Sequence, residues 1–557
     1  MFLYPGKPGF PLSRPTRSVV IPLQTWRDWK FLVPSDGATI LLLVRAVAGL
    51  PLRYEWKPSS PLLLQRVAMS SKPKAAAAPA LISVKADRIR TLSSVKSVKP
   101  SEGGVLYWMS RDQRVQDNWA LLHARQLADE HGVGLSVAFC MVPGFLGATI
   151  RHYGFMLKGL AEVEAELREL GIPFTLLQGE PGAALPDFVR RHKVAAVVSD
   201  FSPLRINRGW KDELVKALPD TPHYEVDAHN VVPVWVASDK KEVGARTIRK
   251  KITERLPEYL TDFPPLPAAP SPHPSASLRA ECAKPVDWAA VDASLTVDRS
   301  VAEVDWCVPG AKAGLAATQE FCASRLRLFA EKRNDPNVHA CSDLSPYTHF
   351  GQIAPQRAAL LVKAHYSKHG EGVKSYLEEA IVRRELSDNF CYYEPNYDNL
   401  QGAAGWARDS LELHASDPRE HVYSLEQLEA SQTHEDIWNA AQTQLVKTGK
   451  MHGFMRMYWA KKVLEWSPDA AEALRRAILL NDKYSLDGRD PNGYVGCAWS
   501  IMGTHDMGWA ERAIFGKIRF MNYAGCKRKF DLKTYVAKWG AGPASAQQPA
   551  KKKAKTS

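Results

Sequence analysis

From Gly104 onward the chain alternates short apolar runs with amphipathic segments, and this alternation constrains the fold more than any other feature. The apolar runs have the length and composition of strands buried on both faces. They are Gly104–Met109, Gly134–Val142, Pro173–Leu177, Ala195–Ser199 and the stretch around Val231–Val234. Helices are predicted between them at Asn118–His131, capped by Asp117, and at Arg151–Leu170, Leu185–His192 and Lys211–Leu218. This pattern predicts a parallel sheet with helices on both faces.

The α/β segment contains no G-x-G-x-x-G motif. Since that motif brings the backbone close to the pyrophosphate of a dinucleotide, an ordinary dinucleotide site is not expected. The carboxyl edge of a parallel sheet nevertheless binds ligands of many kinds. We therefore expect this edge to be able to hold a different chromophore.

Proline becomes frequent at residues 262–300, which predicts a surface connection between domains. Beyond Gly310 only helical patterns follow, at Ala311–Lys332, Ile353–Ser367, Gly372–Cys391, Ser431–Lys447, Met451–Trp466, Asp469–Asn481 and Trp509–Ile514. The predicted architecture is a Rossmann-like α/β domain at 101–236, a linker at 237–309 and an all-helical domain at 310–540.

Both ends of the chain differ in composition from these domains. Residues 1–100 are rich in Pro, Ser, Ala, Arg and Lys, as organelle transit peptides and disordered segments are. A chloroplast transit peptide, an untargeted disordered tail and a start misassigned upstream of Met69 all fit this composition. Residues 541–557 are predicted to be a basic disordered tail, compatible with nuclear import or with a solvated charge run.

The formal net charge of +13 suits a polyanionic partner such as nucleic acid, although much of the excess lies in the two ends. The eight cysteines include no C-x-x-C pair, so we expect no metal site and no disulfide framework, and a reducing compartment fits. The apolar run Ala38–Val44 is too short to span a bilayer. No membrane association is predicted, and a monomer is expected.

The predicted helix over Met451–Trp466 carries Trp459 and Trp466 seven residues apart. Two helical turns place both on one face, about 10.5 Å apart along the axis. Tryptophans with this spacing are more often core residues than parts of a cofactor site. A site is favoured by the polar loop at 481–494, which contains Asn481, Asp487, Asp490 and Asn492. In that loop Asp487 is a candidate partner for Arg456.

Two other segments have alternative interpretations. Ser342–Gly351 offers hydroxyls and free backbone N–H groups before a helix, which fits either a helix cap or phosphate binding. Glu379 and Arg383 lie one helical turn apart, which fits a surface ion pair. Their apolar neighbours instead favour a buried carboxylate that needs a partner, such as an extruded base.

Four motifs together closely resemble the class II cyclobutane pyrimidine dimer photolyases, in particular plant and green-algal members. They are LSPYTHFGQI, EEAIVRREL, HGFMRMYWAKKVLEW and NDKYSLDGRDPNGYVGCAWSI, and the resemblance runs from about Gly104 to Val536. It implies the photolyase/cryptochrome architecture, a flavin adenine dinucleotide (FAD) active as FADH−, and UV-damaged DNA as the partner. It also suggests an antenna chromophore in the N-terminal domain, for which a deazaflavin is the first hypothesis.

The resemblance also implies roles for individual residues. The phosphates of FAD would contact Ser342, Leu344 and Ser345. The Arg456–Asp487 ion pair would lie beside the flavin ring and Asn481 near its N5 edge, with Arg383 and Asp490 as further contacts. Glu379 would hydrogen-bond the flipped-out dimer, and Met457 and Trp499 would pack against it. Basic residues that would contact DNA phosphates are Arg512, Lys517, Arg519, Lys527 and Arg528.

In the mechanism that the resemblance implies, light excites the reduced flavin, which gives one electron to the dimer. The cyclobutane ring splits and the electron returns. An oxidised flavin would be reduced again through Trp459, Trp438 and Trp466, with Trp466 near solvent. Tyr423 and neighbouring tyrosines are further candidates that the sequence does not rank.

Three alternatives remain open from the sequence. One is a cryptochrome, a flavin photoreceptor that signals without repair. Another is a flavin-free DNA-binding protein that keeps only the scaffold. A photolyase specific for (6-4) lesions is disfavoured, because its characteristic histidine pair is not recognisable in the cofactor-loop region.

Overall fold

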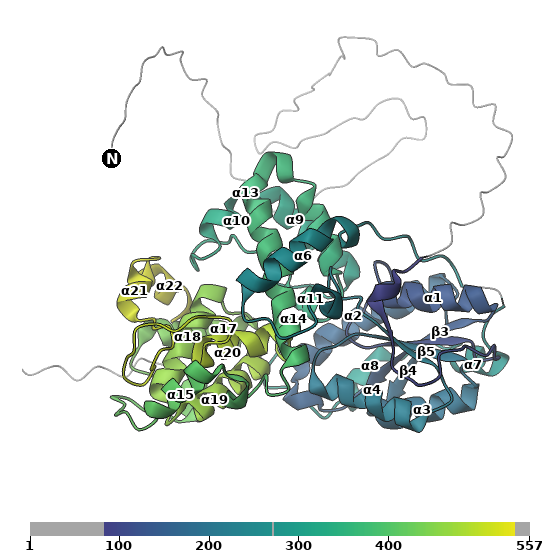
Figure 1. The fold of residues 1–557 in the computed structure, drawn as a ribbon, viewed down its shortest axis with the longest axis horizontal. Helices are drawn as coiled ribbons and strands as arrows, with labels where there is room; N and C mark the ends of the chain where they lie inside the picture. Colours follow the sequence, from purple (N-terminus) through teal and green to yellow (C-terminus); the bar gives the residue numbers. More distant parts are fainter. Residues whose placement is uncertain (1–82, 270–271, 541–557) are drawn as a thin grey trace, which may run out of the picture. The chain divides into compact units, whose positions relative to one another are not determined.

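The computed structural model describes residues 83–269 and 272–540. A six-stranded sheet with its helices forms the first part of these residues, and helices form the rest (Figure 1). The predicted fold class, an α/β domain followed by a helical domain, is confirmed. Residues 1–82 of the extension predicted for 1–100, and the tail predicted for 541–557, lie outside the described residues. None of the helices within the described ranges is long and apolar enough to cross a membrane.

The sheet has the strand order β1-β6-β5-β2-β3-β4. Strands β2 to β6 pair in parallel, whereas the short β1 pairs antiparallel with β6. Their bounds are β1 Ile89–Thr91, β2 Val105–Met109, β3 Leu135–Met141, β4 Phe174–Gln178, β5 Ala196–Asp200 and β6 His223–Val226. The strand order reverses between β2 and β5, so the carboxyl ends of these two strands flank the crevice in which such sheets bind ligands.

Both faces of the sheet are covered by helices. In β2, Tyr107 packs with residues of α1 and α2, whereas Trp108 packs with residues of α3 and α4. Alternate side chains of a strand point to opposite faces, which explains why the whole of β2 is buried. The helices are α1 Trp119–His131, α2 Ile150–Glu169, α3 Pro181–His192 and α4 Arg205–Ala217. Asn118, not the predicted Asp117, caps α1, because its side chain accepts hydrogen bonds from the backbone N–H groups of Ala120 and Leu121.

The α/β domain begins before residue 101. A short 3₁₀ turn at Ala86–Arg88 leads into β1, which completes one edge of the sheet. The buried Arg88 guanidinium donates hydrogen bonds to the carbonyls of Asp227, Asn230 and Val231, at 3.0, 3.1 and 2.6 Å. The predicted extension at 1–100 is therefore too long, because residues 83–100 are part of the α/β domain.

The last strand was misplaced by the sequence pattern. No strand forms at Val231–Val234; β6 lies earlier, at His223–Val226, and a short helix α5 spans Val234–Ala237. The sequence HYEV is too polar to be recognised as a buried strand. Its polar side chains can nevertheless be buried, because they have partners in the interior. His223 bonds Ser199 at 2.9 Å, and Glu225 pairs with Lys211 at 2.7 Å.

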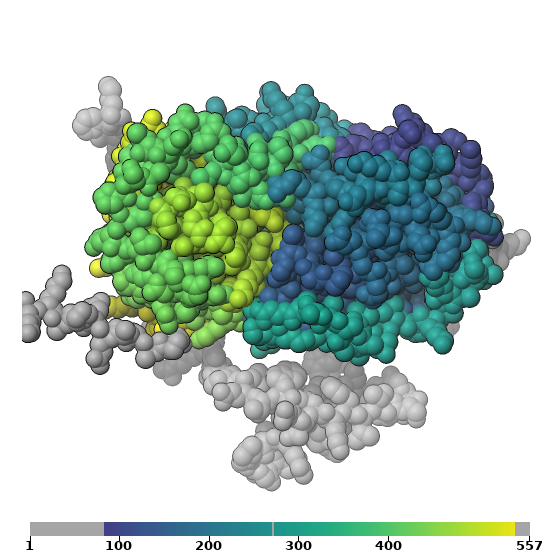
Figure 2. Space-filling view, turned by 90° about the horizontal axis from the view of Figure 1, so that it is seen from below, coloured from purple at the N-terminus to yellow at the C-terminus, as the bar shows by residue number. Residues whose placement is uncertain are grey.

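The segment predicted as a linker contains helices. They are α6 Ala245–Tyr259, α7 Ala276–Glu281 and α8 Trp288–Ser294. Buried Ile248 and Ile252 of α6 pack in one core with Ile381 and Val382 of the helical domain. Trp288 donates a hydrogen bond to Glu164 of α2 at 2.8 Å, and Figure 2 shows the segment around α8, in teal, running along the blue α/β domain.

The helical domain contains a large core of α14 and α17–α20. Its longer helices are α9 Ala311–Ser324, α10 Leu326–Lys332, α12 Pro355–Lys363, α13 Tyr366–Leu377, α14 Arg384–Tyr393, α15 Gly405–Leu413, α17 Asp436–Thr448, α18 Gly453–Trp466, α19 Ala470–Tyr484, α20 Pro491–Met502 and α22 Leu532–Trp539. Shorter helices are α11 Ser345–His349, α16 Leu425–Glu429 and α21 Tyr523–Lys527.

Four expectations for this domain were wrong. The predicted helix Ala311–Lys332 breaks at Arg325, and Gly372–Cys391 contains a π-helix at Glu378–Arg383. The polar loop predicted at 481–494 is shorter, because residues 481–484 end α19 and residues 491–494 begin α20, whose start is capped by Asp490. The predicted helix Trp509–Ile514 is absent; a tight reversal pairs Arg512 with Gly516 instead.

We expect Arg88→Met to lower the free energy of unfolding by about 3 kcal/mol, because it leaves three buried carbonyls without their donor. Urea denaturation followed by circular dichroism measures this change. The matched control is Lys99→Met, which alters an exposed cation of the same segment and should leave the midpoint unchanged. Equal midpoints for the two variants would contradict the role of residues 83–100 in the domain.

Candidate functional site

A cavity in the helical domain is lined by residues from distant parts of the chain. They are His229, Phe329, Ser342, Leu344, Ser345, Thr348, Pro355, Tyr376, Glu379, Ala380, Arg384, Arg456, Asp487, Asp490, Asn492 and Gly493. Seven of the residues predicted from the sequence are among them: Ser342, Leu344, Ser345, Glu379, Arg456, Asp487 and Asp490. We call this space the helical-domain cavity.

One wall of the cavity is a row of hydroxyl groups around α11, from Ser342, Ser345 and Thr348. Asp343 lies between them with a positive φ of 61°. Its carboxylate pairs with Lys450 and, at 2.8 Å, with Arg325. Burial alone would raise the pKa of Asp343, but Lys450 and His339 lower it below its usual value. These ion pairs anchor the segment that presents the hydroxyls.

Arg456 of α18 and Asp487 face one another across the cavity wall, with 3.7 Å between the guanidinium and the carboxylate. Burial acts to raise the pKa of Asp487, yet the charge of Arg456 and hydrogen bonds from Ser485 and Ser345 lower it overall. Asp487 is therefore ionised at neutral pH. The predicted pairing of these two residues is present in the structure.

The π-helix at Glu378–Arg383 supplies another wall. Its wider turn lets Glu379 and Ala380 line the cavity while Ile381 and Val382 enter the core. Glu379 pairs with Arg333 at 2.9 Å and keeps about a third of its side chain exposed. It does not pair with Arg383 as the helical spacing suggested, because the π-turn changes which side chains share a face.

Arg383 lies outside the residues that line the cavity. Its side chain is half exposed and pairs with Glu378 at 3.0 Å. The arginine of this segment that lines the cavity is its neighbour Arg384, which the sequence analysis did not select. Arg384 donates to the carbonyls of Ala380 and His229, and its buried Nη1 has no hydrogen-bond partner among the described residues. A buried guanidinium nitrogen without a partner, in a cavity that also presents hydroxyls, fits an anionic ligand such as a phosphate.

Asn481 lies directly behind the cavity wall. It is buried in α19, and a Cβ on Gly493 would come within 2.9 Å of its amide nitrogen. Only the absence of a side chain at Gly493 therefore leaves Asn481 close to the cavity.

Asp490 lines this cavity and also a second one, in the α/β domain. Its carboxylate is 3.1 Å from His349. Although burial acts to raise the pKa of Asp490, His349 and Arg111 keep it well below its usual value. Asp490 is thus a fixed negative charge between the two cavities.

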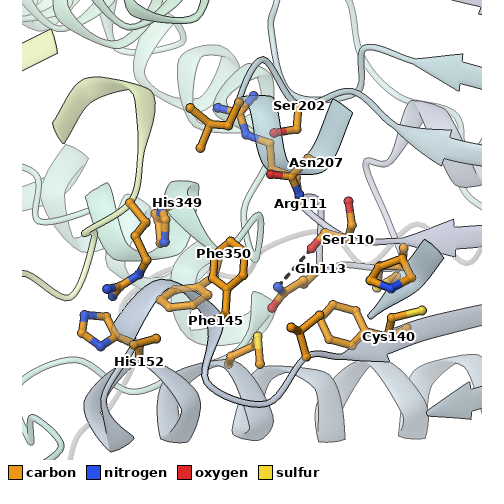
Figure 3. Close-up of a pocket in the computed structure, with 18 of the residues that line it drawn as sticks. Ser110, Arg111, Gln113, Cys140, Phe145, His152, Ser202, Asn207, His349 and Phe350 are labelled. Carbon is orange, nitrogen blue, oxygen red and sulfur yellow. Dashed lines mark hydrogen bonds between the residues drawn. The ribbon is translucent and has the colours of Figure 1, made fainter. Parts of the chain in front are cut away.

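The second cavity lies at the carboxyl edge of the sheet, where the sequence analysis expected a ligand. Figure 3 shows Ser110 and Arg111 just beyond the end of β2, with His349 and Phe350 contributed by the helical domain. Aromatic and apolar side chains make up much of the remaining lining of this cavity. They belong to Trp108, Met109, Phe139, Phe145, Tyr153, Met156, Leu204 and Trp210. We call this space the sheet-edge cavity.

Three tryptophans of the helical domain form a continuous row. Trp438 of α17 lies between the other two, with its ring centroid 6.3 Å from Trp459 and 5.6 Å from Trp466. The indole N–H of Trp438 donates to the carbonyl of Trp459 at 3.0 Å. Trp459 lies one turn after Arg456 on α18, so the row begins next to the helical-domain cavity. The sequence-based order Trp459, Trp438, Trp466 agrees with these distances.

The expectation that Trp466 lies near solvent is wrong. Its exposed fraction is 1%, because Tyr423 and His434 cover it with ring centroids at 5.4 and 5.2 Å. Both covering residues come from the irregular segments that flank α16. Helical spacing carries no information about such loops, and the sequence therefore could not place them over Trp466.

Met457 and Trp499, predicted to pack on a substrate, are half-buried and lie outside the residues that line the helical-domain cavity. Two basic side chains lie near the Trp499 ring, Lys461 at 4.8 Å and Arg519 at 5.5 Å from its centroid. Burial lowers the pKa of Lys461 to about 7. Lys461 also donates to the carbonyl of Ser500 at 2.9 Å, which holds its amine near Trp499.

The basic residues predicted to contact DNA differ in their surroundings. Arg519 pairs with Asp506 at 2.8 Å and lies over Trp509, so its charge is already partnered. The other four are exposed: Arg512, Lys517, Lys527 and Arg528.

Comparison with known proteins identifies the family. The family described as DNA photolyase matches residues 105–272. The "Deoxyribodipyrimidine photo-lyase" of Potorous tridactylus is 54% identical over 85% of this chain and 88% of its own length. The protein of the same name from Arabidopsis thaliana is 50% identical over 82% of this chain and 93% of its own length.

Solved structures agree with the fold described above. A cryptochrome from Synechocystis sp. superposes with a TM-score of 0.61 and 17% identity, over 80% of this chain and 89% of that one. A class III photolyase from Agrobacterium tumefaciens gives a TM-score of 0.59 with 21% identity, over 80% of this chain and 88% of that one. About half of the aligned residues are identical to those of the Potorous and Arabidopsis proteins, over most of the length of each. The chain therefore belongs to the DNA photolyase family.

Proposed function

We propose that the chain repairs cyclobutane pyrimidine dimers in DNA in a light-dependent reaction, with FAD bound in the helical-domain cavity. The observation that carries this proposal is the meeting of Ser345, Glu379, Arg456 and Asp487 in one cavity. Hydroxyls, a carboxylate and a charge-paired wall are what binding of a flavin and an extruded base would require. The relatives named deoxyribodipyrimidine photo-lyase support the same reaction.

The residues of the cavity fit FAD in chemistry. Ser342, Ser345 and the unpartnered nitrogen of Arg384 would hold its phosphates, with Leu344 beside them. Arg456, fixed by Asp487, would place a positive charge beside the flavin ring, and Asn481 would approach it past Gly493. When bound, reduced FAD supplies one electron to the dimer under light and recovers it after the ring has split.

Glu379 would hydrogen-bond the dimer at the cavity wall, and Arg333 holds its carboxylate in place before the substrate arrives. Trp459, Trp438 and Trp466 would carry electrons toward the cavity whenever the cofactor has become oxidised. Exposed Arg512, Lys517, Lys527 and Arg528 would contact DNA phosphates. Met457 and Trp499 would pack against the dimer, and Arg519 would be a further DNA contact. The Trp499 ring centroid lies 4.8 Å from Lys461 and 5.5 Å from Arg519.

The sheet-edge cavity would hold an antenna chromophore, for which a deazaflavin remains the first hypothesis. Its support is the aromatic lining together with Arg111 at one end, since a flat conjugated ring needs both apolar faces and a polar handle.

Glu379→Ala should lower the yield of dimer repair by about tenfold, because it removes a charged hydrogen-bond acceptor from the substrate. The measurement is loss of dimers from a defined oligonucleotide under blue light, with the enzyme reduced beforehand. Glu378→Ala is the matched control: it changes the neighbouring carboxylate, which does not line the cavity, and should leave the yield unchanged. If the wild type removes no dimers under light, repair itself is the wrong function and a signalling photoreceptor becomes the better one.

Trp459→Phe should abolish light-driven reduction of oxidised flavin while leaving repair by pre-reduced enzyme intact, because it interrupts the tryptophan row next to the cavity. Absorption spectroscopy under blue light with a thiol reductant follows the reduction. Trp539→Phe, a half-buried tryptophan of the same domain outside the row, serves as the control. Loss of repair together with unimpaired reduction in Trp459→Phe would reverse the assigned role.

A double variant, Lys527→Ala with Arg528→Ala, should weaken DNA binding and reduce the slope of log affinity against log salt by about 2, because each of the two cations would neutralise one phosphate. Fluorescence anisotropy over a series of salt concentrations measures this slope. Lys216→Ala, an exposed lysine of α4, should not alter it. A slope equal to that of the wild type would remove α21 from the DNA interface.

A further inference from the structure

A lysine is buried next to the partly exposed ring of Trp499. Lys461 of α18 is 0% exposed, and its ammonium lies 4.8 Å from the Trp499 ring centroid. It donates one hydrogen bond, to the carbonyl of Ser500 at 2.9 Å. Within residues 83–269 and 272–540, no carboxylate lies at ion-pair distance from this amine. Lys461 therefore carries a buried positive charge that no counter-ion neutralises directly.

The groups around Lys461 explain why its charge stays unpaired. Helix α20 supplies the Trp499 ring and the Ser500 carbonyl, and two charged groups, Asp506 and Arg519, act on the amine from the segment that follows α20. Asp506 already accepts two hydrogen bonds from Arg519, at 2.8 and 2.9 Å. Burial lowers the pKa of Lys461 to about 7; Asp506 acts against this shift, and Arg519 adds to it.

Such a charge does not serve the stability of the fold. Because the pKa of Lys461 is lowered, keeping the proton on it in the folded protein costs free energy at every pH below the pKa of a free lysine side chain. The next residue shows the usual arrangement, since Lys462 pairs with Glu435 at 3.4 Å and with Glu465 at 2.9 Å. A buried lysine without such partners points to a role outside folding.

The position of Lys461 indicates that role. It follows Met457 by four residues, so both side chains lie on one face of α18. Met457 and Trp499 are the half-buried side chains for which we propose contact with the dimer. The Lys461 amine is therefore close to the proposed substrate surface and yet shielded from water. A charge in such a place acts on its surroundings with little screening by solvent.

We propose that Lys461 is a positioning residue for repair, whose protonated amine, held next to Trp499, stabilises the negative charge that the dimer carries while it holds the extra electron. The electron arrives from reduced FAD and returns to it after the ring has split, as in the proposed function on which this inference rests. Lys461 transfers no proton and no electron. Its contribution is the electric field of a charge that is already in place when the electron arrives.

The proposal makes both DNA binding and repair depend on pH. The phosphates and the dimer add negative charge near Lys461, so binding should raise its pKa. Since the pKa of the free enzyme's Lys461 is about 7, binding at a somewhat higher pH should take up a proton. In the complex, the repair yield should be highest where Lys461 is protonated and should fall as the pH rises through its pKa.

The test is the yield of dimer repair per absorbed photon, with holoenzyme reduced beforehand and saturated with a dimer-containing oligonucleotide, from about pH 6 to about pH 10. We expect the wild-type yield to fall as the pH rises. Lys461→Met should lower the yield about threefold at the acidic end and remove this fall, because no charge is left to titrate. Lys462→Met, the same change in the neighbouring paired lysine, is the matched control and should keep the wild-type pH profile.

Two measurements without light separate this role from a structural one. Calorimetry of oligonucleotide binding at about pH 8, in buffers of different ionisation enthalpy, should show less proton uptake by Lys461→Met than by the wild type. Urea denaturation should give Lys461→Met a midpoint at least as high as that of the wild type, because the variant removes an unpaired buried charge. A structural role would lower this midpoint.

The outcomes distinguish this inference from the proposed function. A pH profile or a proton uptake that is the same in the wild type and in Lys461→Met would overturn the role of Lys461 while dimer repair itself remains. A wild type that removes no dimers under light would instead overturn the proposed function.

Discussion

A buried ion pair joins the two domains and sets the positions of both cavities. Arg111, just after β2, donates two hydrogen bonds to Asp388 of α14, at 2.7 and 3.0 Å. Asn230 donates to the same carboxylate at 3.1 Å. Because both charges are almost fully buried, each would be strongly unfavourable without the other. The sheet edge and the middle of α14 are therefore held in one relative position.

This ion pair affects the sheet-edge cavity through Arg111 and the helical-domain cavity through the π-helix that precedes Asp388. Arg111 itself lines the sheet-edge cavity, so the contact that joins the domains also shapes that cavity. The π-helix with Glu379 comes one turn before Asp388 and ends next to Arg384. A charge network that is satisfied only when the domains are in contact thus also positions the residues for which we propose roles in substrate and cofactor binding.

Much of the fold follows from local pattern, because apolar strands such as Ala196–Asp200 and long amphipathic helices such as α2 need no distant information. Strand β6 could not be predicted from local pattern, since the buried His223 and Glu225 depend on Ser199 and Lys211 from other elements. The same limit applies to the site. Motifs located Ser345, Arg456 and Asp487 correctly, because these residues line the cavity from fixed positions on their elements. Arg384 was missed. Helical spacing also paired Glu379 with Arg383, because it assumes an α-helix where the backbone forms a π-helix.

The π-helix also limits how the length of this segment can vary. Between the cavity wall at Glu379 and the ion pair at Asp388, the chain has one residue more than an uninterrupted α-helix would use for the same two contacts. Adding a second residue there would exceed what the wider turn absorbs, and it would turn one end of the helix by about 100° relative to the other. Either Glu379 would leave the cavity or Asp388 would leave Arg111. The segment therefore tolerates exchanges of side chains more readily than the insertion of a residue.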